Sequence, residues 1–152
     1  MFDTNGEPDR RDRNGLEVLT DRECLELLRS ASVGRVGLTI EALPAILPAN
    51  FAVLDGDVII RTGWGAKLDA ATDNQVVGFE VDDFDPATRQ GWSVLIRGRA
   101  EVVRDPALLE RARQLNLDSW APAPRDHYVR IRSEVVSGRR ITRLVAAETS
   151  GT

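Results

Sequence analysis

The stretch LPAILPANFAVLDGDVIIRT, residues 43–62, is the strongest indication of the fold of this chain. It is rich in apolar and β-branched residues, and the pair Asp55-Gly56 divides it into two runs. An Asp-Gly pair between two apolar runs is a strong signal for a β-hairpin, because both residues accept positive φ angles. The stretch therefore predicts two antiparallel strands. Pro48 restricts the first strand to a sheet edge or a bulge, since proline cannot donate a ladder hydrogen bond.

The residues that precede this hairpin predict a helix and a further strand. In TDRECLELL, Thr20 and Glu23 have the spacing of a capping box and the apolar residues share one helical face, so we expect an amphipathic helix over about residues 21–31. SVGRVGLTI then has the composition of a strand. Residues 1–15 are polar and mixed in charge, and we predict that they form a disordered tail.

The residues that follow the hairpin continue the pattern of strands with short helices. AKLDAATDN predicts a short helix, VVGFEVDDF a strand, WSVLIRGRAEVVR a longer strand and DPALLERARQLN a helix capped by Asp105. HYVRIRSEVVSGRRITRLV predicts one last strand or hairpin, which turns at Ser137-Gly138. Roughly six strands with few helices predict a mainly β fold, an antiparallel barrel with helices around it, rather than alternating βαβ units.

Length and composition narrow the possible functions. The 152 residues suit one domain, and 42% of hydrophobic residues suffices for a core. The net charge of −4 argues against a general nucleic-acid binder, which needs a basic face. A single cysteine, Cys24, and a single histidine, His127, argue against a disulfide framework or a Cys/His metal site. No apolar run reaches the roughly 20 residues of a membrane span, and no hydrophobic signal core is present, so we expect a cytoplasmic protein.

The loop GWGAK contains Lys67, the only lysine among the 20 basic residues. A helix that begins near Ala66 has partial positive charge at its start, so a lysine there is electrostatically unfavourable unless an anion lies nearby. The lysine ammonium, the Thr62 hydroxyl and the first N–H groups of the helix could together bind a phosphate. The alternative is a tight strand-to-helix turn with a solvated lysine. The loop alone does not decide between the two.

Several other residues have two interpretations. Asn50 places an amide among apolar residues, where it must pair with a backbone group or with the polar edge of a heteroaromatic ring. Trp92 begins a long strand and fits either the core or a cofactor contact. His127 follows a proline-rich linker, so we expect a surface or structural role rather than proton transfer. Helical spacing favours burial of Cys24.

Taken in order, these segments resemble the pyridoxamine 5′-phosphate oxidase-like flavin-binding split-barrel superfamily, in particular its small actinobacterial-type members. The resemblance covers roughly residues 18–143. It is carried by SVGRVGLTI, LPAILPANFAVLDGDVIIRT, the loop from Thr62 to Lys67, NQVVGFEVDDFD, GWSVLIRGRAEVV and the closing EVVSGRRI. It implies a six-stranded antiparallel split β-barrel over residues 16–146, followed by a disordered tail at 147–152. It also implies a homodimer with an FMN in each of two clefts at the subunit interface.

The resemblance further implies which residues bind the cofactor. By position, Pro48 to Phe51 would line the isoalloxazine ring, and Arg61, Thr62 and Lys67 would hold the phosphate. Trp92 and Ser93 would reach the flavin from the partner subunit. Trp64 stands where small or polar residues are usual, and its indole could stack on a ring or narrow the cleft. The predicted cofactor-binding residues are Pro48, Ala49, Asn50, Phe51, Arg61, Thr62, Trp64, Lys67, Trp92 and Ser93.

The function implied by the resemblance is that of a flavin-dependent oxidoreductase acting on a small molecule. FMN is the expected cofactor, and the deazaflavin F420 is the alternative, because both offer a phosphate and a tricyclic ring. Pyridoxamine 5′-phosphate oxidases themselves have a C-terminal segment in which a tryptophan and arginines bind the flavin and the substrate phosphate. No such segment follows SGRRI in this sequence, so we do not expect oxidation of vitamin B6. A module that senses or stores a flavin or haem without catalysis is the alternative of a different class, since flavin chemistry requires no acid, base or nucleophile from the protein.

Overall fold

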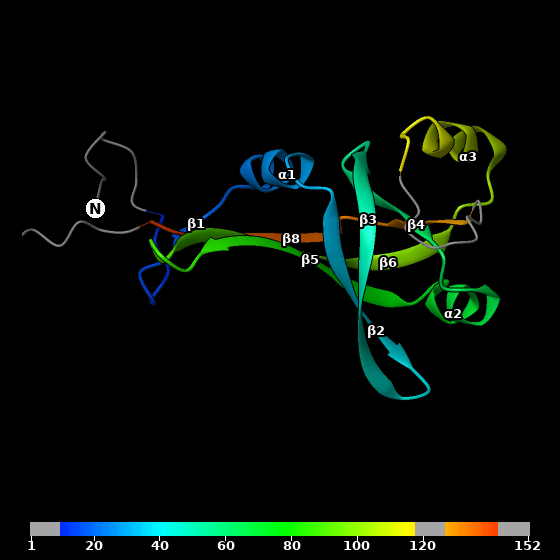
Figure 1. Ribbon diagram of the computed structural model, residues 1–152, viewed down its shortest axis with the longest axis horizontal. Coiled ribbons are helices and arrows are strands. Elements are labelled where there is room, and N and C mark those ends of the chain that lie inside the picture. The colour runs from blue at the N-terminus through cyan, green and yellow to red at the C-terminus, as the bar shows by residue number, and fades with distance from the viewer. Residues whose placement is uncertain (1–9, 118–126, 143–152) are drawn as a thin grey trace, which may run out of the picture.

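Eight strands and three short helices make up the part of the chain that the computed structural model describes, residues 10–117 and 127–142 (Figure 1). Residues 1–9 and 147–152, which the sequence predicts to be disordered, lie outside this part. In chain order the elements are β1 (Glu17–Val18), α1 (Asp21–Arg29), β2 (Val33–Ile40), β3 (Leu43–Leu54), β4 (Asp57–Thr62), α2 (Ala66–Thr72), β5 (Val76–Asp85), β6 (Gln90–Val102), α3 (Pro106–Arg113), β7 (His127–Ile131) and β8 (Val135–Ile141).

Six of these strands close into an antiparallel barrel, which confirms the predicted fold. Their order around the ring is β6-β5-β2-β3-β4-β7, and the pairing of β7 with β6 closes it. The long strand β6 serves two partners in succession: Gly91–Arg97 pair with β8, and Ala100–Val102 pair with β7. β8 pairs with an earlier part of β6 than β7 does. It therefore extends the sheet beyond the barrel. The short strand β1 then pairs with β8.

The hairpin of β3 and β4 forms as the sequence predicts. Asp55 and Gly56 have φ angles of 52° and 80°, the positive values that a type I′ turn requires. Pro48 pairs with Arg35 of β2, whereas the pairing of β3 with β4 begins only at Phe51. Pro48 therefore lies where the other edge of β3 has no strand partner among the described residues. Its predicted edge position is confirmed.

The turn predicted at Ser137-Gly138 is wrong. Both residues lie inside β8, and the chain turns earlier, between Ile131 and Val135. Gly138 is buried beneath α1, where a Cβ atom would lie 2.6 Å from the sulfur of Cys24. The glycine is there because a helix approaches the sheet closely, and such a glycine reads like a turn signal in the sequence.

The segment before β1 is held against the sheet. Asp12 accepts hydrogen bonds from the backbone N–H groups of Asn14 and Leu16, and Arg139 of β8 donates to its second carboxylate oxygen at 3.0 Å. Arg11 also forms a single β-bridge with Glu17. Residues 10–15, which the sequence places in the disordered tail, therefore take part in the fold.

The barrel interior forms the main core, and α1 and α2 cover it near opposite ends of β6 (Figure 1). α1 contributes Cys24 and Leu28, both 0% exposed. α2 contributes Leu68, which is only partly buried. α3 lies on the outside of the barrel, where a second, smaller core includes Ile59 of β4 and Tyr128 of β7. The helix near one end of β6, α1, therefore contributes fully buried apolar side chains to the main core, whereas the helix near the other end, α2, contributes a partly buried one.

Candidate functional site

Alternation along β3 separates the predicted ring-lining residues into two pairs. Ala49 and Phe51 point into the barrel, where they are 8% and 3% exposed. Phe51 packs edge-on against Phe79 at a ring-centroid distance of 4.9 Å. Pro48 and Asn50 lie on the opposite side of the strand, the outer face of the barrel. A ligand on this outer face can contact Pro48 and Asn50 directly, while Ala49 and Phe51 support the strand from within.

The same alternation separates Arg61 from Thr62 on β4. Arg61 lies on the outer face, where its Nη1 atom donates to the Leu117 carbonyl at 2.9 Å. One step beyond the paired residues of β3 and β4, the register places Asn50 opposite Arg61. The outer face of these two strands thus brings together Pro48, Asn50 and Arg61, while the side chain of Thr62 is directed to the other side.

Thr62 points inward at the end of the barrel and is 1% exposed. Its hydroxyl donates a hydrogen bond of 2.8 Å to Oδ1 of Asp69, which lies on α2. The second oxygen, Oδ2, lies 3.1 Å from Nδ1 of His127. His127 is the first residue of β7 and stands opposite Thr62 in the register of β4 and β7. Two neighbouring elements, β4 and α2, and the distant strand β7 therefore meet at one carboxylate.

This end of the barrel is unusual because it buries polar side chains. Thr62, Asp69 and Thr72 are the buried polar residues of the described ranges, with exposures of 1%, 5% and 0%. Thr72 donates to the carbonyl of Leu68 one turn earlier in α2, at 2.8 Å. The sequence pattern alone indicates no site role for Asp69 or His127. No local pattern links them, because the pairing of β4 with β7 is what brings them together.

The loop from β4 to α2 leads directly away from Thr62. α2 begins after Gly65, whose φ angle is 92°, and no side chain caps the start of the helix. Trp64 is half-buried and packs against the main core, so part of its indole is already in use. Lys67 belongs to the first turn of α2, and its side chain lies outside the described part of the structure. Its role as a phosphate ligand stays a prediction.

Trp92 and Ser93 point to opposite sides of β6. Trp92 packs against the main core. Ser93 lies on the outer face and borders a cleft of about 370 Å³ that Glu80 and Arg139 also line. Burial, followed by the hydrogen bond and negative charge of Asp82, raises the pKa of Glu80 to about 7. The cleft therefore contains a carboxyl group that titrates near neutral pH.

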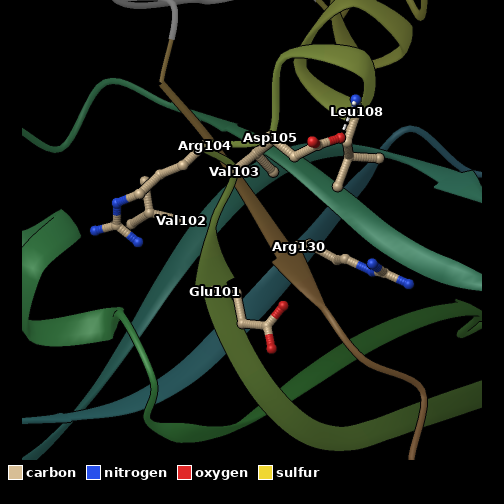
Figure 2. Close-up of a pocket in the computed structure, with 7 residues that line it drawn as sticks. All are labelled: Glu101, Val102, Val103, Arg104, Asp105, Leu108 and Arg130. Atoms are coloured by element: carbon tan, nitrogen blue, oxygen red, sulfur yellow. Dashed lines mark hydrogen bonds between the residues drawn. The ribbon is translucent and has the colours of Figure 1, made fainter.

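A smaller cavity of about 230 Å³ lies beside β6, β7 and the start of α3 (Figure 2). Its charged side chains form ion pairs: Glu101 with Arg132, Arg130 with Asp57, and Arg104 with Asp73. Asp105 accepts a 3.0 Å hydrogen bond from the N–H group of Leu108 and so caps α3. A charged ligand would have to replace these bonds, so we do not place the functional site in this cavity.

A metal site, a membrane span and a reactive thiol are three other possibilities for the described residues. No group of three or more His, Cys, Asp or Glu side chains is arranged there to hold a metal ion. None of the helices in residues 10–117 and 127–142 has the length and apolar character to cross a membrane. Cys24 is buried, and burial raises the pKa of its thiol, which disfavours a reactive thiolate.

Comparison with known proteins gives a consistent result. The sequence profile of the Pyridoxamine 5′-phosphate oxidase family matches residues 20–140. The uncharacterized protein Rv0080 from Mycobacterium tuberculosis is 44% identical over 124 residues, which are 78% of this chain and 81% of that protein. The FAD binding protein from Mycobacterium smegmatis has 40% identity and a TM-score of 0.70, covering 82% of this chain and 97% of that one. A protein from Corynebacterium glutamicum, named provisionally as a pyridoxamine 5′-phosphate oxidase, has 37% identity and a TM-score of 0.75, covering 84% of this chain and 93% of that one.

Proposed function

The chain belongs to the pyridoxamine 5′-phosphate oxidase family, and on that premise we propose that it binds a flavin and uses it as the redox cofactor of an oxidoreductase. The observation that carries the proposal is the outer face of β3 and β4, where Pro48, Asn50 and Arg61 lie together. The likeness to the FAD binding protein from Mycobacterium smegmatis supports the same class of ligand.

These three side chains fit the two halves of a flavin nucleotide. The side-chain amide of Asn50 contains N–H donors and a carbonyl acceptor, the groups that complement the polar edge of an isoalloxazine ring. The guanidinium of Arg61 suits a phosphate group, because its fork of N–H donors matches the spacing of the phosphate oxygens. Pro48 adds an apolar surface on a backbone of restricted φ, against which a flat ring can lie.

We assign complementary roles to the other predicted residues. Lys67 would add positive charge at the phosphate, Trp64 would border the ring, and Thr62 would support the loop between them. Ala49 and Phe51 hold β3 in place from inside the barrel. A bound flavin supplies the hydride chemistry, and the residues of the chain bind it, orient it and exclude water from it.

We also propose that the protein works as a homodimer, because one chain does not complete the site. β2 and β5 lie between β3 and β6, so Pro48 and Ser93 are three strand spacings apart, about 14 Å at the usual distance between strands. A second copy can bring its own Ser93 to the ring, while Trp92, on the other side of β6, packs against the main core and would support that strand. Val33, opposite Asn50 on β2, and Val135, opposite Arg97 of β6 on β8, are 40% and 47% exposed and offer apolar surface near the two halves of such a contact.

The flavin itself has two candidates. FMN follows from the resemblance of the sequence, and FAD is favoured by the 40% identity to a protein that binds FAD. Both have an isoalloxazine ring and at least one phosphate, so both use the same side chains of the outer face. The deazaflavin F420 and haem are the other ligands that the experiment has to separate.

The absorption spectrum of the purified protein and titrations with FMN, FAD, F420 and haem test the proposed ligand. Flavin bands and micromolar or tighter binding of FMN or FAD support it, whereas selective binding of F420 or haem, or no binding of any flavin, contradicts it. Turnover of NAD(P)H with an artificial electron acceptor separates an oxidoreductase from a binding module. Light scattering at micromolar concentration is expected to give the mass of a dimer, and a monomer would contradict the shared site.

A further inference from the structure

The carboxylate of Asp69 is the least exposed ionisable group at the end of the barrel. Asp69 is 5% exposed, and burying a carboxylate is costly unless it is paired and hydrogen-bonded. Two groups compensate it in this structure: the hydroxyl of Thr62 at 2.8 Å and the imidazole of His127 at 3.1 Å. The position of the histidine ring is therefore set by a buried charge, although the ring itself begins a strand at the surface.

The Asp69 carboxylate determines that both Thr62 and His127 act as hydrogen-bond donors to it. An ionised carboxylate only accepts hydrogen bonds, so the Thr62 hydroxyl and Nδ1 of His127 must both act as donors. The remaining ring nitrogen, Nε2, lies on the opposite side of the imidazole from Asp69. The side chain of His127 is 46% exposed, so this nitrogen can meet a ligand from outside. A histidine whose Nδ1 is held by a carboxylate is typical of rings that act through Nε2.

The location of this ring connects it to the loop between β4 and α2. Thr62 is the last residue of β4, the loop follows it at once, and His127 stands opposite Thr62. The Thr62 hydroxyl uses its hydrogen to bond Asp69, so it has none to donate to a phosphate while that bond is made. Arg61 lies on the other side of β4, so a phosphate beyond the end of this strand can be contacted by Arg61 from one side and by a group on the Thr62 side from the other. On the Thr62 side, the imidazole of His127 is in a position to take the place of that hydroxyl.

We propose that His127 is a ligand for the phosphate of the bound flavin, with Asp69 as the residue that positions it. This inference rests on the proposed flavin-binding function. When the phosphate is bound, Nε2 donates to a phosphate oxygen while Nδ1 donates to Asp69, so the ring bridges two anions. Of the elements packed against His127, α2 presents the charged Asp69 and β4 presents the uncharged Thr62. Thr62 contributes through Asp69 rather than by touching the phosphate.

Titrations with FMN and riboflavin test the inference, because riboflavin has the same ring and lacks the phosphate. We expect His127→Gln to weaken FMN binding by about ten- to hundredfold, the range of one charge-assisted hydrogen bond, and to leave riboflavin binding unchanged. Asp69→Asn is expected to weaken FMN binding by about tenfold through misplacement of the ring. His127→Arg places a cation with several donors at the same position and is expected to bind FMN more tightly than His127→Gln does.

The pair Arg111 and Asp55 provides matched control variants, since this arginine is also held by an aspartate, with N–O distances of 2.6 and 3.0 Å, but far from the loop. Arg111→Gln and Asp55→Asn are expected to bind FMN like the wild type. If His127→Gln leaves the ratio of FMN to riboflavin affinity unchanged, or lowers both affinities equally, the phosphate role is wrong although flavin binding stands. If the wild-type protein binds neither FMN nor FAD, the proposed function and this inference both fail.

Discussion

The helices α1 and α2 cover the barrel near opposite ends of β6, and they are built in different ways. α1 begins with a complete capping box, in which Thr20 and Glu23 satisfy each other's backbone N–H groups. α2 has no side-chain cap and starts at a glycine with positive φ. α1 buries a thiol and a leucine, whereas α2 buries Asp69 and Thr72. α1 follows the local rules of helix formation, and α2 departs from them where we place the phosphate of the ligand.

The difference between α1 and α2 separates the part of the fold that provides stability from the part where we propose binding. The α1 end gains stability because its apolar side chains leave water and its backbone groups are capped. The α2 end has weaker local determinants, so tertiary bonds to Thr62 and His127 hold it in place. Variants at the α1 end should therefore change the free energy of unfolding and leave the affinity for flavin alone.

The largest effect is expected for Leu28→Ala on α1. Leu28 is 0% exposed in the main core, so truncation leaves a cavity and should lower the free energy of unfolding by about 2–5 kcal/mol. Urea denaturation measures this change. Leu68→Ala on α2 is the matched variant and should cost less, because Leu68 is only partly buried. If Leu68→Ala lowered the free energy of unfolding more than Leu28→Ala, the conclusion that the α1 end provides more stability than the α2 end would be wrong.

The contact beneath α1 is tested by Gly138→Ala. The new Cβ atom would lie 2.6 Å from the Cys24 sulfur and 3.0 Å from a methyl group of Leu19, so the helix must move. We expect a loss of about 1–3 kcal/mol in the free energy of unfolding, measured by denaturation. Gly37→Ala on β2 is the control, since a Cβ atom at this position would lie 3.9 Å from the Gly78 carbonyl oxygen, an ordinary van der Waals contact. Equal losses for the two glycines would show that close approach of α1 is not the reason.

The cap of α1 is tested by Thr20→Ala. The substitution removes the hydroxyl that accepts a hydrogen bond from the N–H group of Glu23 at 3.2 Å. Loss of such a cap typically costs about 1 kcal/mol, which thermal or urea unfolding can measure. FMN affinity should stay at the wild-type value. A fall in FMN affinity together with unchanged stability would mean that the roles of the two helix ends are interchanged.

The smallest expected effect is the pH dependence of the stabilisation by Glu23, the second residue of the capping box of α1. The hydrogen bond from Arg10, followed by those from Thr20, lowers the pKa of Glu23 from 4.5 to about 2. Stability from this lowered pKa is fully present above pH 4.5 and is lost as the pH falls towards 2. Because solvent screens this carboxylate, we expect a contribution of at most about 1 kcal/mol.

The variant Glu23→Gln measures that contribution. The difference in free energy of unfolding between wild type and Glu23→Gln should be largest at neutral pH and should shrink in acid as Glu23 takes up a proton. Denaturation curves at several pH values between 7 and 2 follow the difference. A difference that stays constant over this range would rule out the ionised carboxylate as its source.

Much of the fold could be predicted because its determinants are local. The capping box of α1, the Asp55-Gly56 turn and the Asp105 cap of α3 each depend on residues a few positions apart. The turn predicted at Ser137-Gly138 was wrong because a glycine has more than one physical use. Its reason lies in Cys24, on an element distant in sequence. A local pattern cannot distinguish a turn from a close contact with another element.

The strands, the helices, the hairpin and the resemblance to a flavin-binding barrel can be predicted from the amino-acid sequence, since periodicity and turn chemistry are properties of neighbouring residues. Only the tertiary structure decided which side chains share a face. Alternation on β4 places Arg61 outside the barrel and Thr62 inside it, although they are adjacent and were predicted to hold one phosphate together. The closure of the barrel then brought His127 to Asp69 and Thr62. Contacts of this kind depend on strand register across the whole sheet, and no short stretch of sequence specifies that register.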